Sequence, residues 1–280
     1  MRQTRSIVTA PRFKRIVSKV EVERKFNLGP NFASIFLSKE REIPQAQRRK
    51  VCNNPGSPFF IVVRQPGQII RDIYYDTQND QLSKLGLWVR QRHVQSLALN
   101  SSGQKNDQDH EGDSHELRWN AKVRLGGHFN NSQFVEVDGK KNVSDEVLKI
   151  TDSMTKLEDL QVVTDLQTRR SSWEVAQLAD GTTPSAKMTI VMDEVTEAKA
   201  GKDRSGKSVF THTIGEVELF QEFVTEGKDK AEHEAQRKRI AARRMEELKE
   251  FMFVNPDLFA TTPTPIGKLS AYYTWKNTRT

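Results

Sequence analysis

Like charges recur at every second residue in several stretches of this sequence, and this spacing limits the folds that the chain can adopt. Glu21 and Glu23 are separated by one valine, and so are Glu216 and Glu218 within Ile214–Leu219. Because successive side chains of a β-strand point to opposite faces, each pair places two carboxylates on one face and apolar residues on the other. One such strand is typical of a half-exposed sheet, so the recurrence of the pattern is the informative part.

Basic residues alternate in the same way elsewhere in the chain. Arg90 and Arg92 share one strand face, Lys122 and Arg124 share another, and Asp193 ends a third polar face. An exposed face would mix Thr, Gln and Ser with its charges, whereas here carboxylates and cations come in separate pairs. The separation predicts strands whose charged faces meet in one enclosed space.

The number of alternating segments indicates the fold class. Many antiparallel strands with a few helices predict an α+β protein, and eight or more strands favour closure into a barrel. We therefore expect a closed or nearly closed antiparallel β-barrel of about eight strands with flanking helices. The predicted strands are Ser18–Phe26, Gln68–Tyr75, Gly86–His93, Glu116–Arg124, Gln133–Asp138, Ser171–Leu178, Met188–Val195, Thr213–Phe223 and Lys268–Trp275.

The remaining segments predict helices, loops and a single folded domain. Helical spacing of apolar residues predicts helices over Asn31–Arg41, Ser144–Gln167 and Glu226–Phe253. Three prolines within Gln45–Gly67, and Pro44 just before it, indicate that this segment is mostly loop around a short strand at Phe59–Val63. We expect residues 1–17 to form a basic tail and residues 18–280 a single catalytic domain, with a polar, mobile insertion at 93–115.

The net charge of +7 is concentrated at the N-terminus. Residues 1–19 carry six basic residues and no acid, which leaves 38 basic and 37 acidic side chains in the rest of the chain. A general nucleic-acid binder spreads excess positive charge over its folded surface, so we do not expect a nucleic-acid partner. The tail has the composition of a mitochondrial presequence, but a solvated basic tail fits equally well, and we expect a cytoplasmic or else mitochondrial protein.

Two further features bear on the class of protein. Cys52 is the single cysteine, which excludes a disulfide framework and fits a reducing compartment. The longest uninterrupted apolar run is Phe59–Val63, far shorter than a transmembrane helix needs, so we expect no membrane association.

A charged barrel interior needs a partner for each sign of charge. A polyphosphate with a divalent metal supplies both, because carboxylate oxygens suit Mg²⁺ or Mn²⁺ and Arg and Lys bind phosphate oxygens. The alternative is that the strands form ion pairs with one another and bind no ligand. Gly201–Ser208 matches a phosphate-binding loop, but the β-branched residues that follow predict a hairpin instead of the required helix.

Six sequence blocks, in order, resemble one known family. The first resembles the E-x-E-x-K signature of the CYTH, or triphosphate tunnel metalloenzyme, superfamily, and the set is similar to the motifs of thiamine triphosphatases. The blocks are Glu21–Phe26, Arg71–Thr77, Leu87–Arg92, Arg170–Trp173, Ile214–Leu219 and Gly267–Tyr272.

The resemblance implies a tunnel of eight antiparallel strands, open or clefted at one end, that hydrolyses the terminal phosphoanhydride of thiamine triphosphate with Mg²⁺ or Mn²⁺. It implies Lys25 and Glu218 as catalytic candidates and Trp88 as a platform for the thiamine ring. The implied metal ligands are Glu21, Glu23, Asp193, Glu216 and Glu218. The implied phosphate ligands are Lys25, Arg90, Arg92, Lys122, Arg170 and Lys268.

Other functions fit the same charges. Tripolyphosphate, a nucleoside triphosphate, an RNA 5′ end or cyclisation of ATP would use the same tunnel, and a polyphosphate-binding module would bind without turnover. Arg124 has no counterpart in the family's motifs, so it is an additional candidate. We expect a monomer whose partner is a small-molecule triphosphate.

Overall fold

A computed structural model describes seven segments of the chain. They comprise residues 15–37, 48–52, 59–97, 117–128, 130–198, 209–226 and 230–279. Most of the predicted basic tail, most of the predicted insertion and the phosphate-loop-like segment Gly201–Ser208 lie outside the described residues.

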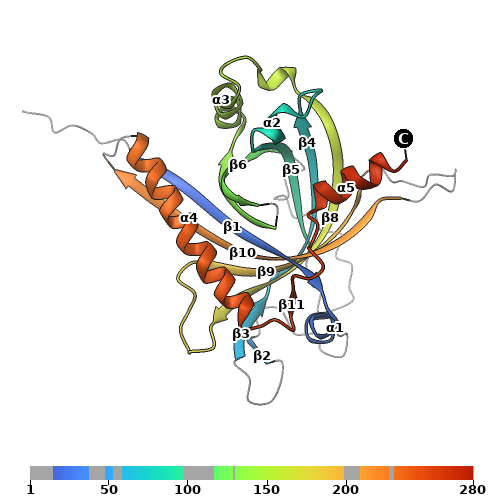
Figure 1. Cartoon of the computed structure of the whole chain (residues 1–280), viewed down its shortest axis with the longest axis vertical. Helices are drawn as coiled ribbons and strands as arrows, with labels where there is room; N and C mark the ends of the chain where they lie inside the picture. The colour runs from blue at the N-terminus through green and yellow to red at the C-terminus, as the bar shows by residue number, and fades with distance from the viewer. Residues whose placement is uncertain are drawn as a thin grey trace, which may run out of the picture.

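Eight antiparallel strands close into a barrel, as the alternation predicts (Figure 1). Their order around the barrel is β8-β4-β5-β6-β7-β1-β10-β9, and β9 pairs with β8 to complete the ring. Closure gives each of these eight strands a partner on both sides, so the ring itself has no open edge. The strands are β1 Arg15–Leu28, β4 Gly67–Asp76, β5 Leu87–Leu97, β6 Arg118–His128, β7 Asn131–Asp138, β8 Gln161–Gln177, β9 Lys187–Glu197 and β10 Thr211–Glu226.

Three short strands extend this sheet outside the ring. β3, Phe59–Arg64, pairs with β8 and confirms the predicted short strand. β2, Arg48–Cys52, pairs with β3, although this segment was expected to be loop. β11, Phe259–Ala260, pairs with the end of β1.

The helices lie around the outside and at one end of the barrel (Figure 1). The segment predicted as a helix at Asn31–Arg41 is helical as far as residue 37, and its last four residues lie outside the described part. The helices are α1 Pro30–Phe32, the π-helix η1 Ala33–Leu37, α2 Gln81–Lys84, α3 Lys140–Ile150, the 3-10 helix η3 Leu157–Asp159, α4 Lys230–Phe253 and α5 Lys268–Asn277.

Two predicted elements are wrong. Lys268–Trp275 is the start of helix α5, not a strand; its aromatic residues pack at helical spacing, and periodicity alone does not separate the two structures in short apolar runs. Ser144–Gln167 is not one helix, because α3 ends at Ile150, two residues before Asp152 and Ser153 adopt positive φ angles of 49° and 64°. The chain then enters β8, which is longer than predicted.

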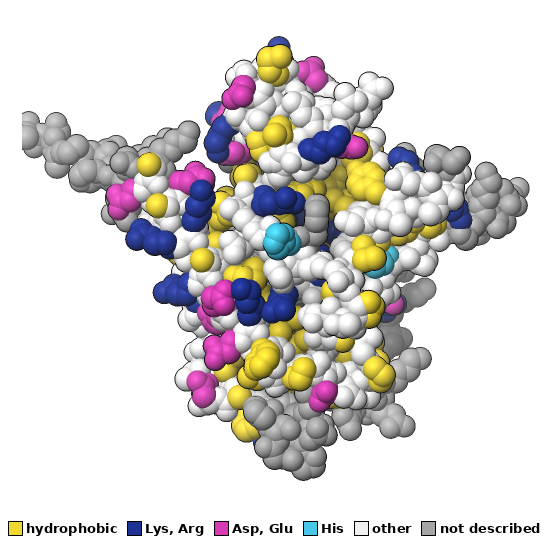
Figure 2. All heavy atoms as spheres, in the orientation of Figure 1, with side chains coloured by type: hydrophobic (Ala, Val, Ile, Leu, Met, Phe, Trp, Pro, Cys, Tyr) yellow, Lys and Arg dark blue, Asp and Glu magenta, His cyan; other side chains and the backbone are white. Residues whose placement is uncertain are grey.

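Helix α4 covers the outer face of β1 and β10 and confirms the predicted charged helix (Figure 1). Its apolar stripe is buried, as expected for a helix that packs on a sheet. Basic and acidic side chains intermix on its exposed face (Figure 2). The stripe consists of Ala241, Met245, Leu248 and Met252.

The hydrophobic core lies mainly outside the barrel wall and beneath the helices. One cluster joins α4 to β1, β9 and β10, and a second packs α2 and α3 on β5 and β6. A third, which includes Tyr74 and Tyr272, lies where α5 meets one end of the barrel. Apolar faces therefore point outward and charged faces inward, as the alternation of the sequence requires. No described helix is long and apolar enough to cross a membrane.

Candidate active site

The barrel encloses a charged cavity of about 830 Å³, measured with its opening to solvent. Every residue that the sequence implicates in the site lines this cavity except Asp193. The structure therefore brings together residues that lie almost 250 positions apart in the chain. These lining residues are Glu21, Glu23, Lys25, Trp88, Arg90, Arg92, Lys122, Arg170, Glu216, Glu218 and Lys268.

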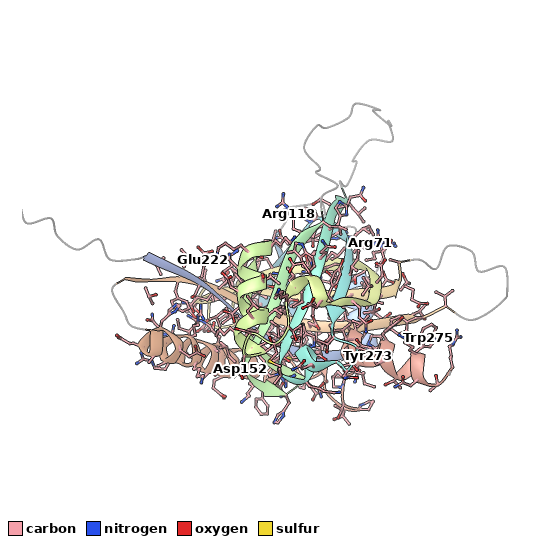
Figure 3. All side chains as sticks on the ribbon, turned by 90° about the horizontal axis from the view of Figure 1, so that it is seen from above. Arg71, Arg118, Asp152, Glu222, Tyr273 and Trp275 are labelled. Atoms are coloured by element: carbon pink, nitrogen blue, oxygen red, sulfur yellow. The ribbon has the colours of Figure 1, made fainter. Side chains whose placement is uncertain are left out.

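The lumen continues beyond this cavity toward the other end of the barrel. Arg90, Arg92 and Glu136 line both this cavity and a second one of about 1660 Å³, which extends to Arg118. Figure 3 shows Arg118 on one side of the barrel and Tyr273, from α5, on the opposite side. The charged cavity is thus one section of a tunnel and opens at the end where α5 begins.

Two neighbouring strands supply a set of carboxylates that we call the carboxylate wall: Glu21 and Glu23 on β1, and Glu216 and Glu218 on β10. In the antiparallel register, Glu23 lies opposite Glu218, so like charges are directly adjacent. One carboxylate oxygen each from Glu21, Glu23 and Glu218 lies within 4.8 Å of the others. Three converging oxygen donors suit a hard divalent cation.

The residues of the carboxylate wall do not have equal pKa values. Burial, together with Glu21 and Glu216, raises the pKa of Glu218 to about 8, although Arg170 opposes the shift. Burial also disfavours ionisation of Glu23, but Lys122 and Lys25 outweigh it and lower the pKa of that carboxyl. The raised pKa lets Glu218 hold a proton at neutral pH, and a nearby cation would favour its ionisation.

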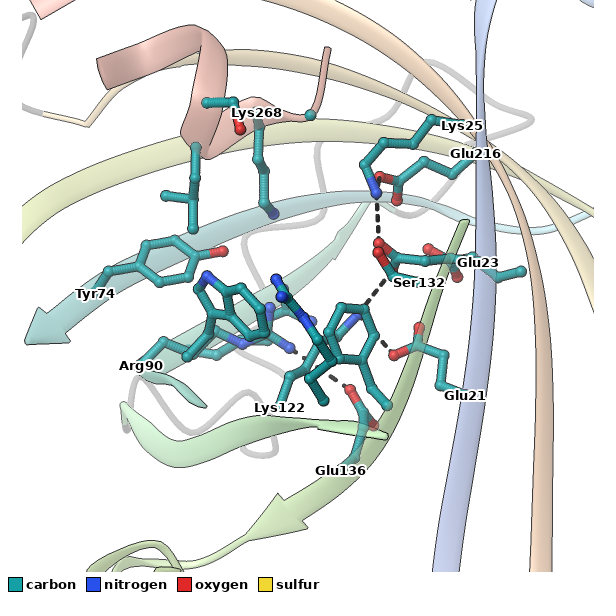
Figure 4. Close-up of a pocket in the computed structure, with 18 of the residues that line it drawn as sticks. Glu21, Glu23, Lys25, Tyr74, Arg90, Lys122, Ser132, Glu136, Glu216 and Lys268 are labelled. Atoms are coloured by element: carbon teal, nitrogen blue, oxygen red, sulfur yellow. Dashed lines mark hydrogen bonds and ion pairs between the residues drawn. The ribbon is translucent and has the colours of Figure 1, made fainter. Parts of the chain in front are cut away.

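Four cations form the opposite side of the cavity, the cationic wall: Arg90 and Arg92 on β5, Lys122 on β6 and Arg170 on β8. Figure 4 shows Arg90 across the lumen from Glu21 and Glu23, with Lys122 reaching between them. Lys122 Nζ lies 2.6 Å from Glu21 Oε2 and 3.0 Å from Glu23 Oε2. Burial opposes the charge of Lys122, but Glu21 and Glu23 raise its pKa, so it stays protonated.

Lys25 connects the two strands of the carboxylate wall. Its Nζ lies 2.5 Å from Glu23 Oε1 and 3.1 Å from Glu216 Oε1. A side chain at Gly267 would place Cβ only 2.8 Å from Lys25 Cε, so the glycine makes room for this lysine. Glu216 thus holds Lys25 and lies apart from the three converging carboxylates (Figure 4).

Asp193 lies behind Arg170 and not with the other predicted metal ligands. Arg170 Nε and Nη2 donate to the two carboxylate oxygens of Asp193, at 2.8 Å each. The carboxylate is 1% exposed, and this bidentate contact occupies both of its oxygens. In this arrangement Asp193 orients Arg170, whose Nη1 lies 3.4 Å from Glu218 Oε1.

Asp72 is a buried carboxylate of the site that the sequence analysis did not identify. Arg92 donates two hydrogen bonds to it, at 2.7 and 2.8 Å, and Lys268 Nζ donates a third at 3.1 Å. Burial disfavours its charge, yet these cations and Arg90 hold the pKa of Asp72 well below its usual range. Its alternation with Tyr74 along β4 was the signal that could have identified it.

Glu136 is a second acid that the sequence analysis did not identify. It lies on β7 and lines the lumen, with Oε1 3.6 Å from Arg90 Nη2. Burial and the neighbouring Glu21 raise the pKa of its carboxyl. Arg90 Nε donates to Asn120 at 2.9 Å, whereas its Nη2 is buried without a hydrogen bond among the described residues. Alternation of Glu136 with Phe134 placed it on the inward face.

Ion pairs between side chains of the barrel neutralise part of the charge in the lumen. This is the arrangement expected if the strands pair with one another and bind no ligand. Each predicted phosphate-side cation lies within 4 Å of a carboxylate of another described residue. The two acids that the sequence analysis missed, Asp72 and Glu136, supply some of these contacts. The pairing does not separate Glu21, Glu23 and Glu218, whose oxygens remain close together.

Lys268 belongs to the site although the element that carries it was wrongly predicted. It is the first residue of helix α5, and its Nζ enters the lumen to contact Asp72 (Figure 4). A lysine at a helix N-terminus gains nothing from the helix dipole, so its contact with the buried acid explains its position.

Aromatic residues border the mouth of the cavity, where Trp88 and Arg124 lie. The Trp88 ring packs edge-to-face with Phe134, with centroids 5.5 Å apart. Arg124, the additional candidate of the sequence analysis, lines the cavity and places its Cζ 4.7 Å from the centre of a Trp88 ring. Trp88 also borders an adjacent recess that contains Tyr75, Val163 and Tyr273.

Most of the chain matches a known protein family. Residues 64–248 match the family model of the CYTH domain. No curated protein matches the chain at a significant level.

Several solved structures are similar to the chain over most of its length. A Hippeastrum protein, described as a proposed adenylyl cyclase that reveals a dominant triphosphatase activity, is 11% identical, with 92% of this chain and 96% of that chain covered and a TM-score of 0.45. A Pyrococcus horikoshii protein is 14% identical, with 92% and 99% covered and a TM-score of 0.41. A Bacillus halodurans protein described as a proposed adenylate cyclase is 14% identical, with 91% and 98% covered and a TM-score of 0.39.

Proposed function

The chain belongs to the CYTH domain family, and we propose that it hydrolyses the terminal phosphoanhydride bond of a triphosphate. The observation that carries this proposal is the opposition of two charged walls in one buried cavity. Three carboxylate oxygens converge within 4.8 Å on one side, and four cations line the other. Such a cavity can hold a metal ion and a polyanion together.

The cationic wall would bind the phosphates and stabilise the charge that spreads over them during transfer. Its side chains are already held in place by carboxylates, Arg170 by Asp193 and Arg92 by Asp72. Prior ordering reduces the conformational entropy that a long cationic side chain would otherwise lose on binding. The buried Nη2 of Arg90, which has no hydrogen bond among the described residues, is a donor available to a phosphate oxygen.

A divalent cation fits the carboxylate wall. Glu21, Glu23 and Glu218 supply oxygen donors of the type that Mg²⁺ prefers, with Mn²⁺ as the second candidate. Burial and the neighbouring Glu21 and Glu216 raise the pKa of Glu218, so a bound cation would favour its ionised form. When bound, the ion would offset phosphate charge and polarise a phosphoryl oxygen.

Glu218 and Lys25 are our candidates for the groups that act on the reacting atoms. Glu218 is buried beside Arg170 of the proposed phosphate site, where its carboxylate could take a proton from an attacking water. Lys25, held between Glu23 and Glu216, would place a positive charge against the leaving phosphate oxygen. These two roles fit hydrolysis by direct attack of water.

The resemblance of the sequence favours thiamine triphosphate, converted to thiamine diphosphate and phosphate. Trp88 supports an aromatic group at this position because its ring borders both the cavity and the adjacent recess. Tripolyphosphate and nucleoside triphosphates present the same three phosphates to the walls, so the walls alone do not distinguish among them.

Phosphate release from thiamine triphosphate, tripolyphosphate and ATP, with Mg²⁺ and with EDTA, tests the proposal. We expect release that requires the metal, and chromatography of the ATP reaction should show ADP. Cyclic AMP as the main product would show that the protein cyclises ATP and does not hydrolyse its terminal phosphoanhydride. Metal-independent binding of tripolyphosphate without turnover of any substrate would contradict the proposal and support a binding module.

A further inference from the structure

Arg90 is held in a different way from the other two arginines of the cationic wall. Arg92 and Arg170 each donate two hydrogen bonds to a buried carboxylate. Arg90 instead donates from Nε to the side-chain amide oxygen of Asn120, at 2.9 Å. The group that holds Arg90 is therefore neutral, whereas the groups that hold the other two arginines are charged.

The carboxylates nearest to Arg90 lie beyond hydrogen-bond distance. Its Nε is 3.8 Å from Asp72 Oδ1, and its Nη2 is 3.6 Å from Glu136 Oε1. Nη2 is buried and has no hydrogen-bond acceptor among the described residues. A buried guanidinium donor without an acceptor is costly, and a phosphate oxygen would supply the missing acceptor.

Asp138 fixes the orientation of the Asn120 amide. Asn120 Nδ2 donates to Asp138 Oδ1 at 2.9 Å and to Val137 O at 3.4 Å. Because a carboxylate only accepts and a guanidinium only donates, the amide points its nitrogen at Asp138 and its oxygen at Arg90. Burial disfavours the charge of Asp138, but hydrogen bonds from Lys19 and Asn120 lower its pKa, so it stays ionised at neutral pH.

The register of three neighbouring strands brings these groups into line. Arg90 on β5 lies opposite Asn120 on β6, and Asn120 lies opposite Asp138 on β7. Asn120 and Asp138 line the second section of the tunnel, whereas Arg90 lines both sections. Because Asn120 does not line the cavity that would hold the phosphates, it would act on them only through Arg90.

A neutral amide at this position keeps the positive charge of Arg90 available to a ligand. A carboxylate in its place would form an ion pair with the guanidinium and offset the charge that attracts a phosphate. The amide supplies an acceptor for Nε without adding a charge, and the carboxylate of Asp138 stays one strand further away.

We infer that Asn120 is a positioning residue that aims the guanidinium of Arg90 at a bound polyphosphate without neutralising it, and that Asp138 sets the direction of its amide. The inference rests on the phosphate site of the proposed function. It adds two residues that lie outside the cavity in which the phosphates would bind.

The test moves the negative charge by one strand and leaves the total charge unchanged. In the double variant Asn120→Asp/Asp138→Asn, the carboxylate lies against Arg90 and the amide lies on β7, so the two groups keep a hydrogen bond to each other. The control is Asp138→Asn alone, which places no carboxylate against Arg90. The measurement is calorimetric binding of methylenediphosphonate with Mg²⁺, a probe without a phosphoanhydride bond to hydrolyse.

We expect the double variant to bind the diphosphonate about tenfold more weakly, because a unit negative charge moves roughly 5 Å closer to the bound anion. Its free energy of unfolding should not fall, since the new carboxylate pairs with Arg90. Asp138→Asn alone should bind within about twofold of the wild type.

Equal affinity of the double variant and the wild type would overturn the inference. A purely structural role for Asn120 would give this result, with a loss of stability and no change in the affinity of the folded protein. Tenfold weaker binding by Asp138→Asn alone would also overturn it, because the effect would then not come from the charge placed against Arg90.

A second variant covers the case in which the double variant does not fold. Asn120→Leu is close in size and has no acceptor for Arg90 Nε, so the diphosphonate should bind about fivefold more weakly, as expected for the loss of one hydrogen bond. Wild-type affinity in Asn120→Leu would overturn the inference.

The same measurements separate this inference from the proposed function, because binding of the diphosphonate needs no turnover. The expected shifts in affinity, in a protein that hydrolyses no triphosphate, would overturn the proposed function alone. Normal hydrolysis with unshifted affinities would overturn the inference alone. Absence of diphosphonate binding by the wild type would overturn the inference together with the phosphate site on which it rests.

Discussion

The carboxylate wall and the cationic wall are built differently although they face the same lumen. Like charges of the carboxylate wall lie on two paired strands, and Glu23 is directly opposite Glu218. The cations come from three strands, and most have a carboxylate of their own, as Arg170 has Asp193 and Arg92 has Asp72. Three of the four cations therefore have acids outside the carboxylate wall as partners, whereas the facing pair Glu23 and Glu218 concentrates negative charge that a metal ion would offset.

The two walls differ most in how they tolerate the loss of one member. Removing the charge of Glu218 reduces repulsion with Glu21 and Glu216, and Arg170 keeps Asp193 as its partner, so this change should cost function more than stability. Removing the partner of a buried cation leaves an uncompensated charge, so it should cost stability. Substitutions on each side test this difference.

The largest effect is expected from Glu218→Gln, which keeps the size of the side chain and removes its charge. We expect turnover of the preferred triphosphate to fall about 10³-fold, comparable to the loss of a preorganised electrostatic group, while the protein stays folded. The measurement is steady-state phosphate release over a range of Mg²⁺ concentrations. The control is Glu174→Gln on the same barrel, a partly exposed residue paired with Lys187 at 3.7 Å. Unchanged turnover in Glu218→Gln would remove this residue from the site.

On the cationic side, Asp72→Asn should lower the free energy of unfolding by about 3 kcal/mol, because Arg92 and Lys268 lose the charge of their shared acceptor. Urea denaturation at neutral pH measures the difference. A loss below about 1 kcal/mol would show that the cations find other partners.

The loss of stability in Asp72→Asn should depend on pH, and the lowered pKa of Asp72 gives the direction. The pKa of Asp72 is lowered in the folded protein, so its contribution to stability is present above its unfolded value, about 3.9, and is lost as the pH falls through the folded pKa. The stability difference between wild type and Asp72→Asn should therefore be constant near neutral pH and shrink below about pH 4. Denaturation curves between neutral and acid pH check this, and a gap that widens on acidification would contradict the assignment.

Arg90→Gln tests the phosphate side of the comparison. We expect kcat/KM to fall about a hundredfold, because the variant loses a charged donor that reaches the buried lumen. The Mg²⁺ concentration for half-maximal activity should stay unchanged, since the ion pairs of Arg90 within the described residues are with Asp72 and Glu136. Arg90→Lys, which keeps the charge, should recover part of the loss. A shift in the metal requirement would show that the two walls do not act separately.

Gly267→Ala should have a smaller effect, through Lys25. The new Cβ would lie 2.8 Å from Lys25 Cε, so the lysine must move away from Glu23 and Glu216. We expect turnover to fall about tenfold with little change in stability, because Gly267 has a φ of −68°, which alanine also adopts. The matched control is Gly29→Ala, another residue that precedes a helix, where the Cβ would lie 3.8 Å from the nearest atom. Equal activity of both variants would exclude this role for Gly267.

The smallest effect is expected at the exposed rim. Lys19 Nζ lies 2.7 Å from Asp138 Oδ2, but both side chains are more than one-third exposed. Lys19→Gln should change the free energy of unfolding by less than about 1 kcal/mol and leave turnover intact. Urea denaturation and phosphate release measure the two quantities. A loss of unfolding free energy similar to that of Asp72→Asn would show that the exposed ion pair at the rim contributes as much to stability as the buried pairs in the lumen.

Much of the barrel could be predicted from the alternation of charged and apolar residues, because this pattern is a property of each strand by itself. The faces of Glu21 and Glu23, or of Arg90 and Arg92, follow from the geometry of one strand, and seven of the eight barrel strands were located at about their observed positions. Segments without a clear period failed. Lys268–Trp275 forms a helix, because packing against the barrel end decided what the local pattern left open. The last seven residues of Ser144–Gln167 form part of β8, which pairs with β4 and β9.

The sequence by itself determined which faces are charged, and it placed Glu218, Lys25 and Lys122 in a common lumen through the requirement that the apolar faces be covered. Only the tertiary structure decided which charges meet. The register sets Glu23 against Glu218, Asp193 behind Arg170, Asp72 beneath Arg92 and Arg124 upon Trp88. The physical reason is that the direction of a side chain depends on its own strand, whereas its partner depends on how distant strands pair around a closed ring.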